Sequence, residues 1–216
     1  MAKRRAPRDD AAPAHCRCVL LLVDVINDLE FPGGARLLSG ARRLAKTLAP
    51  LAKRAREQGI PVIYANDNFG HWRSDFRAQV EHCLHDEVRG GELAAALAPQ
   101  ECDYFVLKPR HSAFYSTALE TLLRHLGAKV IVLAGIAGDN CVLFTAHDAY
   151  MRDYRLIVPR DGIASESAAN NAWALRHMRR FLKVETPRAK DIDLLALASV
   201  RKVRRSVRGV VRTSDR

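Results

Sequence analysis

The segment CVLLLVDV, residues 18–25, holds five apolar residues in succession from Val19 to Val23. A short continuous apolar run of this kind predicts a β-strand that is buried on both faces, as in the middle of a parallel sheet. Asp24 follows directly and places a carboxylate at the end of that strand. The segment therefore predicts both the centre of a sheet and a polar group at its edge.

Short apolar runs alternate with longer amphipathic stretches after this first strand. Further strands are predicted at 61–66, 103–108, 129–135 and 154–159, with a short one near 183–185. Helices are predicted at 35–58, 115–127, about 140–152, 166–182 and 188–200, and a weaker helical pattern covers 75–98 after a loop at 67–76. Because this alternation is typical of βαβ units, the sequence predicts an α/β fold built around a parallel sheet.

The basic character is concentrated at the two ends of the chain. The sequence has 216 residues and a formal net charge of +11, but residues 1–17 hold five Lys/Arg against two Asp, and residues 201–216 hold seven against one. We therefore predict one nearly neutral domain at 18–200, between a disordered basic N-terminal tail and a basic C-terminal tail. Solvated tails are the simpler interpretation, and attachment to nucleic acid or another acidic partner is the alternative.

Composition argues against several classes of protein. No apolar run approaches the ~20 residues that a membrane helix needs, and no leader peptide opens the sequence, so we expect a cytoplasmic protein that does not contact a membrane. The five cysteines are an odd number in a chain of this size, which argues against a disulfide framework. Neither the dinucleotide-binding nor the P-loop glycine motif occurs, so no nucleotide cofactor is expected.

Three residues that can carry out chemistry stand at predicted strand ends. Asp24 ends the first strand, Lys108 ends the third, and Cys141 lies six residues after Gly135, where the loop after the fourth strand becomes a helix. Ligands of open α/β sheets bind outside these ends. A helix N-terminus and an ammonium group can lower the pKa of a thiol, and a carboxylate can take its proton. Each residue could also have a purely structural role, but their common position at one edge of the predicted sheet favours a site for nucleophilic catalysis.

Four segments carry a more specific signal. They are LLLVDVINDLEF (20–31), VLKPRHSAF (106–114), VLAGIAGDNCVLFTAHDAYMRDY (132–154) and DGIAS (161–165). Together they resemble the isochorismatase-like cysteine hydrolases, a superfamily that includes nicotinamidases, N-carbamoylsarcosine amidase, ureidoacrylate amidases and isochorismatase. The similarity covers about 18–186 in the family's order. It implies a single-domain, three-layer α/β fold with a six-stranded, mostly parallel sheet flanked by helices.

The resemblance also implies roles for individual residues. Asp24 would be the general acid/base, Lys108 would hold the carboxylate and the thiolate in place, and Cys141 would be the nucleophile. A cis peptide bond is implied between Ile136 and Ala137, with the backbone N–H groups of Ala137 and Cys141 facing the oxyanion. The implied reaction hydrolyses a C–N bond of a small amide or ureido compound through a thioester. Relatives commonly pair through the helices after the fourth and fifth strands, so a homo-oligomer, a dimer or tetramer, is expected.

Candidate residues of the substrate pocket lie on the loops that follow the strands. They are aromatic or polar side chains: Phe31, Asn68, Phe69, Trp72, His111 and Phe114. A structural interpretation stands beside this one, because Phe31 and Phe114 could close the core and Trp72 could be an oligomer contact.

No metal or other cofactor is expected. Nicotinamidases usually carry an Asp-x-His pair after the second strand, but the residue two positions after Asp67 is Phe69, which cannot bind a metal. One alternative is a nicotinamidase whose altered metal site uses Asp67 with His71, or with His82, His85 or His111. The others are an isochorismatase-type ether hydrolase and a binding protein that uses the basic tails. Cys141 favours C–N hydrolysis, because isochorismatase proper cleaves an enol ether and need not use the thiol.

Overall fold

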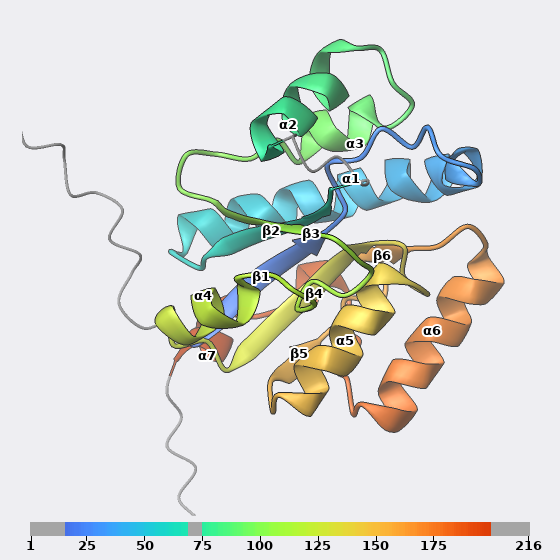
Figure 1. The fold of residues 1–216 in the computed structure, drawn as a ribbon. Helices are drawn as coiled ribbons and strands as arrows, with labels where there is room; N and C mark the ends of the chain where they lie inside the picture. The colour runs from blue at the N-terminus through green and yellow to red at the C-terminus, as the bar shows by residue number, and fades with distance from the viewer. Residues whose placement is uncertain (1–15, 69–74, 200–216) are drawn as a thin grey trace, which may run out of the picture.

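The computed structural model describes residues 16–68 and 75–199, and its centre is a parallel sheet with helices on both faces (Figure 1). The strands are β1 (Cys18–Val23), β2 (Val62–Asp67), β3 (Tyr104–Lys108), β4 (Val130–Ile136), β5 (Arg155–Ile157) and β6 (Ile163–Ala164). Five of them follow the order β3-β2-β1-β4-β5, and β6 pairs with the end of β4. Each of these pairings is parallel. The predicted α/β class and the six-stranded sheet are confirmed.

The helices form a layer on each side of the sheet. They are α1 (Gly34–Glu57), α2 (Phe76–His85), α3 (Gly91–Ala96), α4 (Leu119–His125), α5 (Cys141–Met151), α6 (Ala168–Phe181), the 3-10 helix η1 (Ala189–Asp191) and α7 (Leu194–Ala198). One face of the sheet is covered by α1, α2 and α3, and the other by α4, α5 and α6 (Figure 1). No helix in the described part of the chain combines the length and the apolar character that crossing a membrane requires.

Strand β1 lies in the middle of this arrangement and contributes to two separate cores. Leu20 and Leu22 pack into the core on the α1 side. Val19, Leu21 and Val23 alternate with them and pack into the core on the α4 and α5 side. Because successive side chains of a strand point to opposite faces, a strand covered on both faces must be apolar at every position, as β1 is.

Several predicted helices are shorter in the structure. The weak pattern at 75–98 is two helices, because Glu87 adopts a left-handed backbone with φ 55°, through which a helix cannot continue. The helix predicted at 115–127 begins only at Leu119, after Ser116 with φ 53°. The helix predicted at 188–200 is divided into η1 and α7, and Asp193 caps α7 by accepting from the Ala196 N–H.

The sheet also differs from the predicted sheet at its margins. The strand predicted near 183–185 is a single bridge between Glu185 and Ile157. The sequence analysis assigned no strand to Ile163 and Ala164, which form β6 against the end of β4. The predicted tails lie outside the described residues except for Cys16 and Arg17. Cys16 is buried, and its N–H donates to the Leu126 carbonyl, so the packed structure begins before residue 18.

Candidate active site

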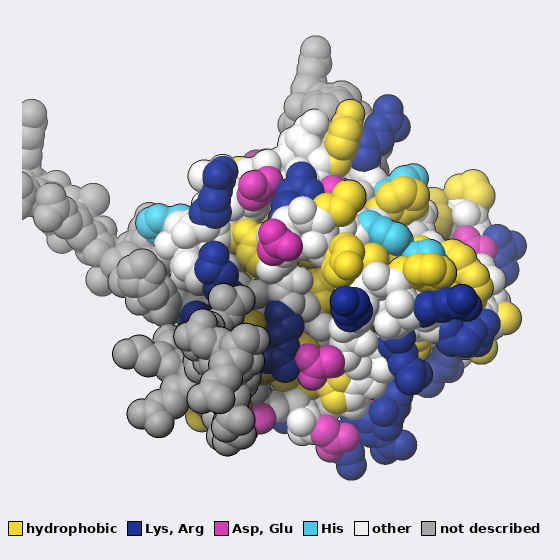
Figure 2. Space-filling model, turned by 90° about the horizontal axis from the view of Figure 1, so that it is seen from below, with side chains coloured by type: hydrophobic (Ala, Val, Ile, Leu, Met, Phe, Trp, Pro, Cys, Tyr) yellow, Lys and Arg dark blue, Asp and Glu magenta, His cyan; other side chains and the backbone are white. Residues whose placement is uncertain are grey.

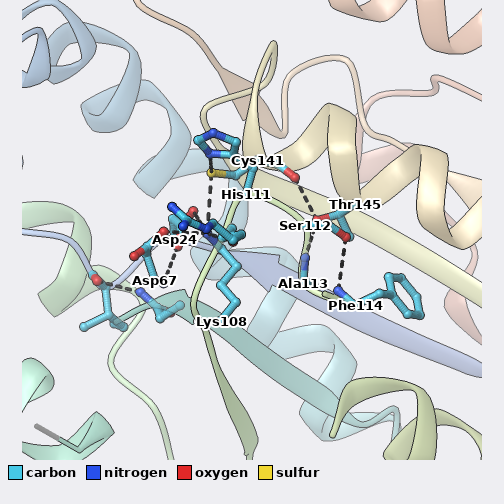
Figure 3. A network of polar contacts seen from close by, with 12 residues as sticks. Asp24, Asp67, Lys108, His111, Ser112, Ala113, Phe114, Cys141 and Thr145 are labelled. Carbon is cyan, nitrogen blue, oxygen red and sulfur yellow. Dashed lines mark hydrogen bonds and ion pairs between the residues drawn. The ribbon is translucent and has the colours of Figure 1, made fainter. Parts of the chain in front are cut away.

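The three predicted catalytic residues meet at one edge of the sheet. Asp24 directly follows β1, Lys108 is the last residue of β3, and Cys141 is the first residue of α5. The chain runs from β1 outward to β2 and β3, and from β4 outward to β5 on the other side. The boundary between β1 and β4 is therefore a topological switch point, where open α/β sheets bind their ligands. Figure 3 shows the three side chains converging there.

Lys108 is the centre of the polar network. Its Nζ lies 2.9 Å from Asp24 Oδ2 and donates to Cys141 Sγ at 3.5 Å. It also lies 3.2 Å from Asp67 Oδ2 and donates to the Arg110 carbonyl at 3.2 Å. The Lys108 side chain is fully buried, so these protein groups take the place of water around the ammonium.

Asp67 is a site residue that the sequence analysis considered only as a ligand of an altered metal site. The parallel register of β2 and β3 places it opposite Lys108. Its backbone N–H donates to Asp24 Oδ1 at 2.7 Å, while its carboxylate faces the ammonium (Figure 3). Its position at the end of the second strand was a signal in the sequence that it could belong to the site. The strand register that places it opposite Lys108, however, cannot be derived from residue spacing.

The electrostatics of the site disfavour a free thiolate. Burial raises the pKa of the Cys141 thiol to about 12; the charge of Asp24 adds to this effect, and the Lys108 ammonium opposes it. Burial also raises the pKa of Asp24, and Lys108 offsets only part of that shift. Burial alone would lower the pKa of Lys108, but the charges of Asp24, Cys141 and Asp67 raise it. These shifts favour the ammonium form of Lys108 and the protonated form of Cys141, whereas the sequence analysis expected a lowered thiol pKa.

The backbone before Cys141 forms a hydrogen-bonded turn. The peptide bond between Ile136 and Ala137 is cis, as the resemblance implies. The Ala137 carbonyl accepts from the N–H groups of Asn140 and Val142 at 3.1 Å each. Because Cys141 is the first residue of α5, its own N–H has no acceptor within the helix.

The DGIAS segment has a structural role beside this turn. The Gly138 N–H donates to the Ala164 carbonyl at 2.8 Å, and the Asp139 N–H donates to Ser165 Oγ at 3.1 Å. Ser165 in turn donates to Asn171 on α6. The segment thus ties the loop before the nucleophile to β6 and α6.

Two hollows adjoin the nucleophile. The first, of about 230 Å³, is lined by Asp24, Asn27, Phe31, Leu37, Asp67, Ile136, Ala137, Asn140, Cys141 and Glu166. The second, of about 550 Å³, is lined by Asp67, Asn68, Pro109, Arg110, His111, Tyr115 and Ser116. His111 Nδ1 lies 3.9 Å from Cys141 Sγ, and Figure 3 shows the sulfur between the His111 ring and the Lys108 ammonium. The first hollow therefore contains the thiol, and the second is connected to it through His111.

The predicted pocket residues fall into three groups. Phe31, Asn68 and His111 line these hollows. Phe114 is not among the lining residues: it is buried in the core, where its ring contacts Tyr154 and lies under the Arg152 guanidinium. Phe69 and Trp72 lie outside the described residues.

The histidines considered for an altered metal site are dispersed. Within residues 16–68 and 75–199, no three His, Cys, Asp or Glu side chains cluster as metal ligands would. His82 lies between Asp28 and Asp86, and His85 pairs with Glu81. His71 lies outside the described residues.

Comparisons with known proteins match the sequence and the fold of this chain. A family model described as an isochorismatase domain matches residues 18–188. YaaI of Bacillus subtilis (strain 168), an uncharacterized isochorismatase family protein, is 42% identical over 173 residues, which cover 80% of this chain and 94% of that protein. The ureidoacrylate amidohydrolase RutB of Methylorubrum extorquens is 39% identical over 193 residues, with 76% of each chain covered. The structure of N-carbamoylsarcosine amidase from Thermoplasma acidophilum has a TM-score of 0.64 at 26% identity and covers 82% of this chain and 99% of that one.

Proposed function

The chain belongs to the isochorismatase family of hydrolases, and from this premise we propose that it is a cysteine hydrolase that cleaves a C–N bond of a small amide or ureido compound. The observation that carries the proposal is the contact of one ammonium with both a thiol and a carboxylate. Lys108 Nζ lies 3.5 Å from Cys141 Sγ and 2.9 Å from Asp24 Oδ2 at the switch point of the sheet.

The first half of the reaction forms an acyl-enzyme. Asp24 accepts the thiol proton as Cys141 Sγ attacks the substrate carbonyl carbon, and the carbonyl π electrons move to the oxygen. The backbone N–H groups of Ala137 and Cys141 donate to that oxyanion. When the oxyanion collapses, the C–N bond breaks, and Asp24 returns its proton to the departing nitrogen. The products of this half are a free amine or ammonia and a thioester on Cys141.

The second half releases the acid. Asp24, again a carboxylate, takes a proton from a water molecule while the water oxygen attacks the thioester carbon. Collapse breaks the C–S bond, and the proton on Asp24 returns to the sulfur. Lys108 stays charged throughout and holds the sulfur and the carboxylate within reach of each other.

The size and chemistry of the site support an amide or ureido substrate. The hollow that contains the thiol measures about 230 Å³, which suits a small molecule. Two of the similar proteins are named as an ureidoacrylate amidohydrolase and an N-carbamoylsarcosine amidase, both of which act on C–N bonds. An amine is expelled poorly unless it is protonated, and Asp24 is placed to supply that proton.

The first test is ammonia release from a panel of small amides, ureido acids and nicotinamide. Cys141→Ala and Cys141→Ser should each lower kcat/KM by roughly a thousandfold or more, because both remove the thiol that attacks the substrate. Mass spectrometry of the wild-type protein mixed with substrate should show an adduct on Cys141.

Cys102→Ala is the matched control, because Cys102 is an exposed thiol far from the site in the fold. It should keep the wild-type rate. Full turnover by folded Cys141→Ala, or cleavage of an enol ether in place of every amide, would refute the proposed reaction.

A further inference from the structure

We propose that Asp67 is a positioning residue of this active site, which supplies a second carboxylate to the Lys108 ammonium and orients Asp24. The proposal rests on the cysteine hydrolase function above and adds a residue to the three that it uses.

The Lys108 ammonium has more acceptors than the three catalytic residues provide. Asp24 Oδ2 and Asp67 Oδ2 lie 2.9 Å and 3.2 Å from Nζ. The Arg110 carbonyl and Cys141 Sγ complete the set at 3.2 Å and 3.5 Å. An ammonium has three N–H groups, so four acceptors leave none of them free. Because the Lys108 side chain is fully buried, Asp67 is one of the few groups that determine where Nζ lies.

Asp67 also orients the carboxylate that moves the proton. Its backbone N–H donates to Asp24 Oδ1 at 2.7 Å, which leaves Asp24 Oδ2 for the ammonium. The side chain of the same residue reaches Lys108, since the two stand opposite each other in the register of β2 and β3. One residue therefore holds Asp24 through its main chain and Lys108 through its carboxylate.

The second carboxylate matters most when Asp24 is neutral. In the proposed reaction Asp24 accepts and returns a proton in each half, so its charge disappears and reappears. A buried ammonium that loses its only counterion is strongly destabilised. Asp67 keeps one negative charge beside Lys108 through both halves of the reaction. With the thiol protonated, two carboxylates and one ammonium also leave a net negative charge, which favours retention of the proton that Asp24 and Cys141 share.

Two substitutions at Asp67 separate the effect of its contact with Lys108 from the effect of its charge. Asp67→Asn keeps an oxygen that can accept from Lys108 and removes the charge, whereas Asp67→Ala removes both. Asp148→Asn is the matched control: Asp148 lies on α5, 2.7 Å from Arg152, and its side chain is 25% exposed against 26% for Asp67. The primary measurement is the rate at which iodoacetamide alkylates Cys141 in the intact protein across a pH series, followed on the Cys141 peptide by mass spectrometry. It needs no substrate.

We expect Asp67→Asn to move the alkylation profile of Cys141 to lower pH, because loss of a nearby negative charge eases deprotonation of the Asp24–Cys141 pair. Asp148→Asn should leave the profile unchanged. On the best substrate of the panel, Asp67→Asn should lower kcat about tenfold with little change in KM. Asp67→Ala should lower kcat roughly a hundredfold, because the contact to Lys108 is lost as well.

An alkylation profile of folded Asp67→Asn that coincides with the wild-type profile would overturn the proposal. So would a rise in KM alone, which would make Asp67 a substrate contact. Equal losses in Asp67→Asn and Asp67→Ala with an unmoved profile would leave only a structural role and would also overturn it. If the profile shifts but no amide is hydrolysed, the positioning role stands and the proposed reaction fails, so the two ideas are tested separately.

Discussion

At Cys141, burial and the charge of Lys108 act in opposite directions on the acidity of the thiol. The ammonium of Lys108 favours the thiolate, but burial and the Asp24 carboxylate together raise the thiol pKa to about 12. A thiol of this kind becomes a nucleophile only while its proton is being removed. The raised pKa of Asp24, itself caused first by burial, makes this carboxylate a stronger base than an exposed one. The two groups thus titrate as a pair that shares one proton.

The pH dependence of activity follows from this pair. Asp24 must be ionised to accept the thiol proton, and its pKa is raised, so kcat/KM should be full above that raised pKa and fall as the pH drops through it. The fall should come at a higher pH than the ordinary Asp pKa of 3.8. No alkaline loss is expected until the pH approaches about 12, where Cys141 gives up the last shared proton. A pH series of kcat/KM checks this, and a second rise near pH ~8.5, the ordinary thiol pKa, would show instead that a preformed thiolate reacts.

At the scale of elements, the end of β4 is paired on both sides just before the nucleophile. Gly135 stands opposite Val23 of β1 and also opposite Ile163 of β6. Its backbone has φ 131°, a conformation that favours glycine, and a Cβ there would lie 2.0 Å from the Val23 carbonyl oxygen. This close approach sets the distance between the strand that carries Asp24 and the loop that leads to Cys141.

Gly135→Ala is therefore expected to destabilise the fold and to separate the catalytic residues. We expect a loss of roughly 3 kcal/mol or more in the free energy of unfolding, from the added steric overlap and the unfavourable backbone. Gly59→Ala is the control, because Gly59 has φ +67° but no atom near its Cβ position within 4 Å. It should cost only about 1 kcal/mol. Urea denaturation of both variants measures the difference, and equal losses would contradict the steric explanation.

At the scale of the whole molecule, the outer surface of α5 and α6 carries a contiguous aromatic face, formed by Phe144, His147, Trp173, His177 and Phe181. His177 contacts His147, Trp173 and Phe181. The side chains of Phe144, Trp173 and Phe181 are each about half exposed. Figure 2 shows hydrophobic and histidine side chains gathered there, with Lys and Arg around them. Monomeric proteins seldom expose large contiguous apolar patches, so we expect a partner to cover this face.

The homo-oligomer implied by the resemblance stays a prediction, and this aromatic face is the surface that we expect a second copy to cover. A twofold axis would let the same patch serve both subunits. The double variant Trp173→Ser and Phe181→Ser should shift the protein to monomer in analytical ultracentrifugation. Leu195→Ser, at a residue on α7 that is 55% exposed against 54% for Phe181, should not. A wild-type protein that sediments as a monomer would exclude this interface.

Much of the fold could be predicted from local patterns. The continuous apolar run of β1 and the helical spacing within α1 are signals of neighbouring residues, and both elements form close to where they were expected. The split of the 75–98 pattern, the shortened α4 and the two residues of β6 could not be predicted in this way. Each depends on backbone conformations or on pairing with a distant strand, which local spacing does not encode.

The sequence by itself determined the strand ends at which Asp24 and Lys108 stand and the start of the helix that carries Cys141, because the patterns that predict these elements lie in neighbouring positions of the chain. Only the tertiary structure decided that Asp67 shares the Lys108 ammonium, that Phe114 turns into the core and that burial keeps the Cys141 thiol protonated. The register between strands and the water lost from each group decide these properties, and both arise only when segments distant in the chain pack together.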